Sequence, residues 1–180
     1  VPEPGRVVLQ FDGLDVLATV FLNDQIVGTA DNMLVSHAFD VTGVIQPGKN
    51  TLTVRLDSAM NSLRGKDIPI AVHGVEQFGE QVLFRKPGHS FGWDIAPRLV
   101  TAGIWRDVSL KLLPPTRITQ AYFVTTHADA NRAHLRLKYT LTTDDPFLED
   151  LTLSVTGVCG ESRFGFERKV VTFNGQVHFS

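Results

Sequence analysis

The stretch VLATVFLNDQIVGTA, residues 16–30, decides the fold class of this chain. Two short runs rich in apolar and β-branched residues flank a central Asn23-Asp24 pair. Asn and Asp tolerate the left-handed backbone conformation that a tight hairpin turn requires. The stretch therefore predicts a β-hairpin that turns at Asn23-Asp24.

Alternation with a period of two residues continues outward from this hairpin. In NTLTVRLDS, residues 50–58, Leu52, Val54 and Leu56 are expected on one face of a strand and the polar residues on the other. The same pattern recurs in Val108/Leu110/Leu112, Leu135/Leu137/Tyr139/Leu141 and Leu151/Leu153/Val155. No stretch of ten or more residues has a convincing 3.6-residue period, so the sequence predicts an all-β protein.

A Pro114-Pro115 pair marks the expected boundary between two domains, because consecutive prolines end a strand ladder and stiffen the connection. About six strands are expected before the pair. Residues 59–103 are the exception: they hold one short strand candidate, VLFRK at 82–86, and a loop region this long inside a compact domain is usually functional.

Five short, regularly spaced strands are expected after the proline pair, as in a β-sandwich. An immunoglobulin-like sandwich normally has about seven strands in about 100 residues, so the second domain is expected to be truncated. The opening, VPEPGRVVLQF, lacks a starting Met and a signal-peptide pattern and leads almost directly into a strand. The chain is therefore interpreted as an internal piece of a longer protein.

Composition narrows the function classes. The 180 residues are 43% hydrophobic and 20% charged, which suits one large or two smaller globular domains. A net charge of -2 without a basic cluster argues against nucleic acid as a partner. No apolar run approaches the roughly 20 residues of a membrane span. The single cysteine, Cys159, excludes an internal disulfide and leaves the cellular compartment open.

The strongest candidate site lies in the loop FGWDIAP, residues 91–97, where Trp93 and Asp94 stand side by side. Sugar rings expose C–H faces that pack on an indole, and their hydroxyls need acceptors such as the two oxygens of a carboxylate. The pair therefore favours a saccharide site. Each residue alone has a structural alternative: Trp93 could plug the end of a sandwich core, as predicted for Trp105, and Asp94 could cap a turn.

Other chemistry finds little support in the sequence. Glycoside hydrolysis usually needs two carboxyl groups about 5–9.5 Å apart, and no motif fixes two candidates on rigid strands. The candidates in the long loops are Asp67, Glu76, Glu80 and Asp94. The six histidines, His37, His73, His89, His127, His134 and His178, show no paired ligand spacing. Nucleophile elbows and glycine-rich phosphate loops are also absent. We therefore predict no catalytic residue, no metal ligand and no cofactor in this segment.

Two long stretches, residues 9–56 and 84–110, together resemble a known domain. They contain FDGLD, ATVFLN, DNM, FDVT, GKNTLTV, RK, FGWD and GIWRDVSL in the order of the family pattern. This pattern resembles the N-terminal jelly-roll domain of glycoside hydrolase family 2, and within that family it is most similar to β-mannosidases. The distinction from β-galactosidases and β-glucuronidases rests mainly on DNM and FGWD.

Four departures from the family pattern fall in its turns and loops. Ile95 replaces the second Trp of the family, Ala96 its following Gly, and Leu34 the Phe after DNM, while Asn23-Asp24 replaces an Asn-Gly turn. The Ile95 change touches the loop nearest the substrate. It leaves the exact sugar specificity open.

The resemblance implies a galactose-binding-like jelly roll over residues 1–113, with its first strands missing, and a truncated immunoglobulin-like sandwich over 116–180. A catalytic (β/α)8 barrel with both catalytic glutamates would follow beyond Ser180. In the family, the loop that carries Trp and Asp reaches the barrel and lines the pocket for the non-reducing-end sugar. Trp93 would then wall the pocket, and Asp94 would hold sugar hydroxyls.

Asn32 and Arg85 are weaker candidates for the same substrate-binding rim. Asn32 could instead be a turn amide that bonds to backbone. Arg85 and Lys86 could orient Asp94 electrostatically or simply bridge loops, and the structural interpretation is preferred for Asn32, Arg85 and Lys86 alike.

The function expected from these residues is that of a non-catalytic N-terminal portion of a retaining, exo-acting β-glycosidase, first of all a β-mannosidase. Its partners would be a β-linked carbohydrate substrate and the catalytic barrel of the same parent chain, with no nucleic acid and no membrane. The alternatives are a β-galactosidase-like or β-glucuronidase-like member of the family, or a free-standing carbohydrate-binding module. A purely structural domain would require the Trp93-Asp94 pair to be a coincidence.

Overall fold

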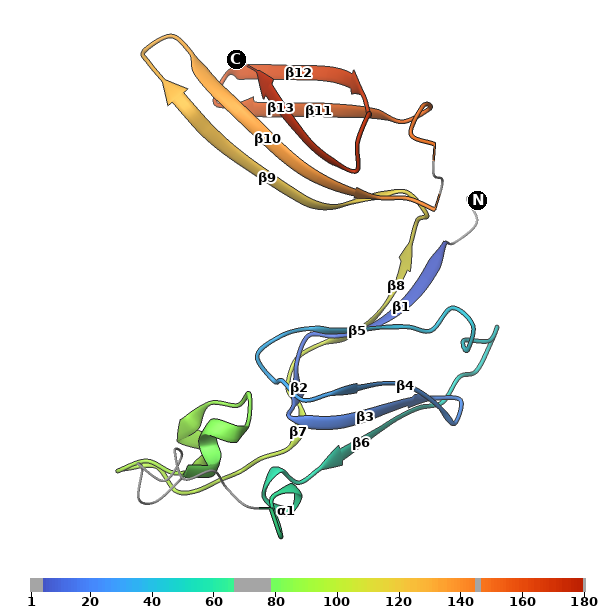
Figure 1. Ribbon diagram of the computed structural model, residues 1–180, viewed down its shortest axis with the longest axis vertical. Helices are drawn as coiled ribbons and strands as arrows, with labels where there is room; N and C mark the ends of the chain where they lie inside the picture. The colour runs from blue at the N-terminus through green and yellow to red at the C-terminus, as the bar shows by residue number, and fades with distance from the viewer. Residues whose placement is uncertain (1–4, 67–78, 145–146, 180) are drawn as a thin grey trace. The chain divides into compact units, whose positions relative to one another are not determined.

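The computed structural model describes residues 5–66, 79–144 and 147–179. These residues form two compact units, Arg6–Leu113 and a second unit built from Gly5 and residues 114–179. Nearly all of the regular structure is antiparallel β-strand, so the predicted all-β class is confirmed (Figure 1). Across the described residues, no helix is both long enough and apolar enough to span a membrane.

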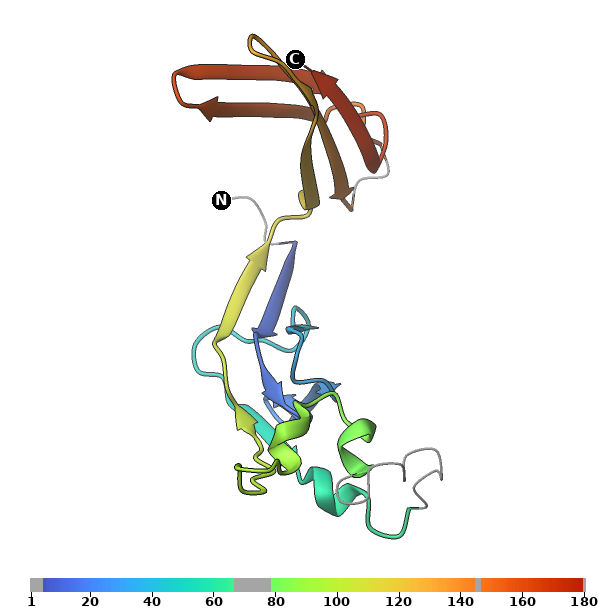
Figure 2. The ribbon, with the colours of Figure 1, turned by 90° about the vertical axis from the view of Figure 1, so that its left-hand side faces the viewer.

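The first unit is a sandwich of two three-stranded antiparallel sheets (Figures 1 and 2). One sheet has the order β5-β1-β8 and consists of β1 (Arg6–Phe11), β5 (His37–Asp40) and β8 (Val108–Leu113). The other has the order β4-β3-β6 and consists of β3 (Leu17–Leu22), β4 (Gln25–Ala30) and β6 (Leu52–Asp57). A short ladder also pairs β2 (Leu14–Asp15) with β7 (Gly103–Ile104).

Alternating side chains of β1 and β3 supply most of the core between these sheets. The core cluster contains Val7, Leu9, Phe11, Leu14, Ala18, Val20, Leu22, Ala30 and Val41. Val54 and Leu56 of β6 pack against it, as the period-two pattern predicts. The alternating face of β8 is more exposed than that of β6, with 52% of Leu110 exposed.

The predicted hairpin is confirmed. Strands β3 and β4 pair through a two-residue turn in which Asn23 and Asp24 have φ angles of 48° and 64°. Asn23 also ties this turn to the neighbouring loop: its amide donates to the Val44 carbonyl at 3.1 Å and accepts from the Thr51 N–H at 3.0 Å. The residue types at positions 23 and 24 therefore allow the turn, and the hydrogen bonds of the Asn23 side chain stabilise it.

The region between β6 and β7 contains short helical turns rather than the predicted strand. Helix α1 (Ala59–Ser62) is capped by the Ser58 hydroxyl, and two 3₁₀ helices follow, η2 (Gly79–Leu83) and η3 (Gly88–Phe91). The strand expected over residues 82–86 is therefore wrong. Its first two residues end η2, and its only ladder contact is an isolated bridge between Arg85 and Asn32.

The described residues of the second unit form two antiparallel sheets. Strands β9 (Arg117–Ala128), β10 (Ala133–Thr142) and β13 (Asn174–Phe179) form one sheet with the order β13-β10-β9, and β11 (Thr152–Cys159) pairs with β12 (Ser162–Lys169) in the other. The core cluster contains Leu137, Tyr139, Leu141, Leu153, Val170 and Val177. Five short strands were expected after the prolines. The described residues there contain five strands, β9 to β13, of which β9 and β10 are longer than predicted.

Candidate functional site

The Trp93-Asp94 loop begins at a buried aromatic anchor in the first unit. Phe91 ends η3 with no exposed surface, and its ring stacks on that of Phe84 with centroids 5.9 Å apart. Gly92 follows with a φ angle of 116°, a conformation that residues with a side chain rarely adopt. The chain can therefore leave the buried anchor abruptly and bring the next residues to the surface.

A tight turn then presents the two candidate residues. The N–H of Trp93 donates to the carbonyl of Ala96 at 3.3 Å, and the N–H of Ala96 donates back to the carbonyl of Trp93 at 3.1 Å. This reciprocal pair places Asp94 and Ile95 at the tip. The backbone at the tip is held by its own hydrogen bonds, so the side chains are not required to hold it.

The side chains at the tip face solvent. Trp93 is 67% exposed and Ile95 is 95% exposed, so Trp93 does not plug the sandwich core. Asp94 is exposed as well, and no hydrogen bond to its carboxylate is found within residues 5–66, 79–144 and 147–179. The turn-capping alternative for Asp94 therefore has no support in this part of the chain. An exposed indole stands beside an uncommitted carboxylate.

Asn32 and Arg85 lie next to each other but engage backbone. They form an isolated parallel bridge, and the N–H of Met33 donates to the carbonyl of Arg85 at 3.0 Å. The side-chain oxygen of Asn32 accepts from the N–H of Leu34 at 2.9 Å, which is the turn-amide arrangement considered above. Arg85 forms no ion pair with Asp94 among the described residues. Asn32 and Arg85 therefore pair with each other through backbone, and no contact of either with the Asp94 carboxylate is seen in this part of the chain.

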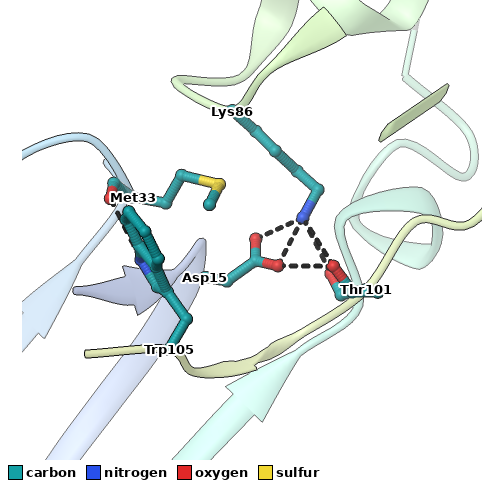
Figure 3. Close-up of polar contacts among 5 residues, drawn as sticks. All are labelled: Asp15, Met33, Lys86, Thr101 and Trp105. Atoms are coloured by element: carbon teal, nitrogen blue, oxygen red, sulfur yellow. Dashed lines mark hydrogen bonds and ion pairs between the residues drawn. The ribbon is translucent and has the colours of Figure 1, made fainter. Parts of the chain in front are cut away.

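Lys86 has a different role from Arg85. Its ammonium group is buried and contacts both carboxylate oxygens of Asp15 on β2, together with the carbonyl and hydroxyl oxygens of Thr101, each at 3.1 Å (Figure 3). The Thr101 hydroxyl donates to Asp15 at 2.8 Å. Lys86 therefore bridges segments, as the structural interpretation predicts, and does not pair with Asp94.

Sequence reasoning did not identify Asp15 or Thr101. The available signal was a carboxylate inside the apolar run GLDVLATV, because a charge that is buried among apolar residues must be paired. Asp15 itself is 3% exposed. Its partner lies 71 residues further along the chain, so no local spacing rule could have named Lys86.

Glu80, one of the candidate acids, is committed to a structural ion pair. Its carboxylate accepts from Arg98, which also donates to the sulfur of Met60 at 3.2 Å. Burial by itself raises the pKa of Glu80, but hydrogen bonds to its own backbone N–H and to Arg98, together with the charge of Arg98, outweigh burial and lower this pKa overall. Of the other loop candidates, Asp67 and Glu76 lie outside the described residues.

Trp105 lies at the surface and does not plug the core, in contrast to its predicted role. It is 43% exposed, and its ring covers Gly13, where an added Cβ would come within 2.3 Å of the indole nitrogen. The Arg106 guanidinium lies 4.1 Å from the ring centroid, a cation–π arrangement. The indole N–H donates to the carbonyl of Met33 at 3.2 Å (Figure 3), which joins the residue after β7 to the segment that follows Asn32.

The histidines contribute no metal centre within the residues that the structure describes, where no group of three or more His, Cys, Asp or Glu side chains could hold a metal ion. His37 instead contacts the carbonyl of Asn32 at 2.6 Å. His127 and His134 lie opposite each other on β9 and β10. His73 is outside the described residues. The chemistry that the first unit offers is therefore the polar and aromatic surface of the loop.

Comparisons with known proteins agree with this architecture. The chain is 31% identical to β-mannosidase B of Thermothelomyces thermophilus over 92% of its length, and 32% identical to rat β-mannosidase over 71% of its length. The crystal structure of the β-D-mannosidase of Dictyoglomus thermophilum is similar over 98% of this chain, with 26% identity and a TM-score of 0.78. A β-glucuronidase of Bifidobacterium dentium shares the fold, with 21% identity and a TM-score of 0.61.

The chain spans only part of these relatives: 21% of the fungal β-mannosidase, 15% of the rat enzyme and 22% of the bacterial crystal-structure chain. The model of the glycosyl hydrolase 2 galactose-binding-like domain matches residues 1–106. That match covers the whole region that carries the loop, its anchors and the buried Lys86 network. The chain therefore belongs to glycoside hydrolase family 2.

Proposed function

We propose that this chain is the non-catalytic N-terminal portion of a retaining, exo-acting β-mannosidase, with the Trp93-Asp94 turn lining the pocket for the non-reducing-end sugar. The observation that carries the proposal is the turn itself. It presents a 67% exposed indole and, within the described residues, a carboxylate without a hydrogen bond, on a backbone closed by two reciprocal hydrogen bonds. An apolar sugar face can pack on the indole while the carboxylate accepts from hydroxyls.

The proposal divides the chain into a jelly-roll domain of sugar-binding type over residues 1–113 and an immunoglobulin-like domain over 116–180. In this proposal neither domain supplies the catalytic acid or the nucleophile, and Glu80, one of the candidate acids, is held by Arg98. Those groups are assigned to a catalytic barrel in the same parent protein. The β-mannosidase names of the fungal and rat relatives support mannosides as the substrate class.

Aryl glycosides test this proposal in the full-length protein. We expect kcat/KM for an aryl β-mannoside to exceed that for the matching β-galactoside and β-glucuronide by at least about 100-fold, which corresponds to about 2.7 kcal/mol of transition-state discrimination. A preference for the glucuronide or galactoside would assign the parent to another branch of the family. The isolated 180-residue segment should release no aryl alcohol above buffer.

A free-standing carbohydrate-binding module is the competing function. It predicts measurable sugar affinity without any hydrolysis by the parent protein. We expect the isolated segment to bind mannose or mannobiose at millimolar strength or below detection, because one wall of a pocket cannot offset the cost of association. Micromolar binding by the segment, measured by calorimetry, would favour the binding module.

A further inference from the structure

We propose that Asp15, Lys86 and Thr101 form a clamp of positioning residues that holds the Trp93-Asp94 turn in its sugar-binding geometry. This inference rests on the proposed function of the turn. The three residues do not reach the sugar themselves. They act by fixing where the loop begins and where it ends.

The clamp closes both ends of one segment onto a single carboxylate. Lys86 immediately precedes residues 87–100, and Thr101 immediately follows them. Both residues bind Asp15: Lys86 through its ammonium group, and Thr101 through its hydroxyl at 2.8 Å (Figure 3). Because β2 pairs with β7, the shared carboxylate belongs to the sheet framework and not to the loop.

Both charged groups of this connection are buried. The side chains of Lys86 and Asp15 are 1% and 4% exposed, so both ions have lost almost all of their water. Such a pair contributes little stability compared with apolar side chains, since desolvation offsets much of the attraction. Four oxygen atoms of Asp15 and Thr101 surround the three N–H donors of the ammonium group, so displacing either residue would leave the buried charge with fewer acceptors. The pair therefore specifies position.

A second set of contacts carries this position from the clamp to the turn. The N–H of Leu99 donates to the carbonyl of Ser90 at 3.2 Å and joins the two arms of the loop midway. Phe91, on the same arm as Ser90, is buried against Phe84. The two arms of the loop are thus held together at the clamp and again at the Leu99–Ser90 hydrogen bond. These contacts fix the orientation of the short turn between the arms.

Thr101→Val in the full-length glycosidase tests the clamp. Thr101 is exposed and valine has the same shape, so the fold should tolerate the change, and the ion pair and the Thr101 carbonyl contact remain. We expect kcat/KM for an aryl β-mannoside to fall about tenfold, because small displacements of a positioning group are costly. Thr101→Ser, which restores the hydroxyl, should recover most of this loss.

A mutant cycle with the Trp93→Ala/Asp94→Ala double variant separates positioning from a general structural effect. If the clamp acts through the turn, Thr101→Val should change kcat/KM by less than about twofold in the Trp93→Ala/Asp94→Ala background. Thr53→Val on β6 is the matched control, since Thr53 is an exposed threonine with no side-chain hydrogen bond in the described part of the chain. It should leave kcat/KM unchanged.

The outcomes distinguish the two proposals. An Asp94→Ala protein that is impaired, combined with an unimpaired Thr101→Val protein, overturns the clamp and leaves the proposed function intact. Equal tenfold losses in the wild-type and Trp93→Ala/Asp94→Ala backgrounds would also overturn the clamp, because the effect would not pass through the turn. An Asp94→Ala protein with normal kcat/KM would overturn the role of the turn and the clamp together.

Discussion

The β3–β4 hairpin and the Trp93-Asp94 loop are held together in opposite ways. The hairpin reverses at Asn23 and Asp24, which adopt left-handed φ angles as their residue types allow, and its two strands pair with each other across that turn. The loop has no periodic pattern. Its ends are joined by Asp15, a residue 71 positions from Lys86 and 86 from Thr101. Local residue chemistry builds the first region, and distant partners build the second.

This difference is consistent with the binding role that we propose for the loop. Its backbone polar groups are satisfied by the reciprocal Trp93–Ala96 bonds and by the Leu99–Ser90 bond, while the clamp fixes its base. The side chains at the tip are therefore not needed to hold the backbone of the turn within the described residues. Binding residues are often found on loops that a rigid scaffold positions in this way.

The largest effect is expected where a distant partner is removed. Lys86→Met leaves the Asp15 carboxylate buried and unpaired, which should cost about 3–5 kcal/mol of unfolding free energy. Thermal or urea unfolding of the parent protein measures this loss. If the pair specifies geometry and contributes little net stability, the double variant Asp15→Leu/Lys86→Met should recover much of it. A double variant as unstable as the single one would show that the charges themselves stabilise the fold.

The next effect concerns the tip of the loop. Asp94→Ala in the full-length protein should lower kcat/KM for an aryl β-mannoside by about 100-fold or more, because charge-assisted hydrogen bonds to hydroxyls are each worth about 1.5–3 kcal/mol when buried. The melting temperature should stay within about 2 °C, since the carboxylate has no hydrogen bond in the described structure. Early melting with normal turnover would identify Asp94 as a structural residue instead.

The hairpin should respond to a local change. Asn23→Ala removes the side-chain hydrogen bonds to Val44, Asn50 and Thr51. It also places alanine, which adopts the left-handed conformation less readily than asparagine, at a φ angle of 48°. We expect a loss of about 1–2 kcal/mol in unfolding free energy and no change in KM. The Asp24→Gly variant is the companion, because glycine suits the φ angle of 64° better, and it should be neutral or slightly stabilising.

The smallest effect belongs to the Glu80–Arg98 pair beside the loop. The folded-state pKa of Glu80 is below its ordinary value of 4.5, so its contribution to stability is present above that pH and is lost as the pH falls through the folded-state pKa. The pair is partly exposed, which limits the contribution to less than about 1 kcal/mol. The stability of Glu80→Gln and of the wild type, compared between pH 3 and pH 6, should converge at the acidic end.

The aromatic residues show where sequence reasoning succeeds and where it stops. A Trp next to an Asp between a glycine and a proline indicated a loop with exposed polar and aromatic groups, and the structure places Trp93 at the surface. Trp105 was predicted to plug the end of the sandwich core, but it lies at the surface and is 43% exposed. The Trp105 indole packs over Gly13 and under the Arg106 guanidinium at the surface. The spacing of these three residues in the sequence does not predict that packing.

The sequence by itself determined the all-β class, the Asn23-Asp24 hairpin, the alternating face of β6, and the family to which the chain belongs. These depend on residues that are close together, since strand alternation repeats every two residues and a tight turn uses only two. Only the tertiary structure decided that residues 82–86 form no strand, that Glu80 is paired, and that Asp15 gathers Lys86 and Thr101 around one carboxylate. Such contacts join chain segments separated by tens of residues, and a buried charge finds its partner only after the sheets have brought those segments together.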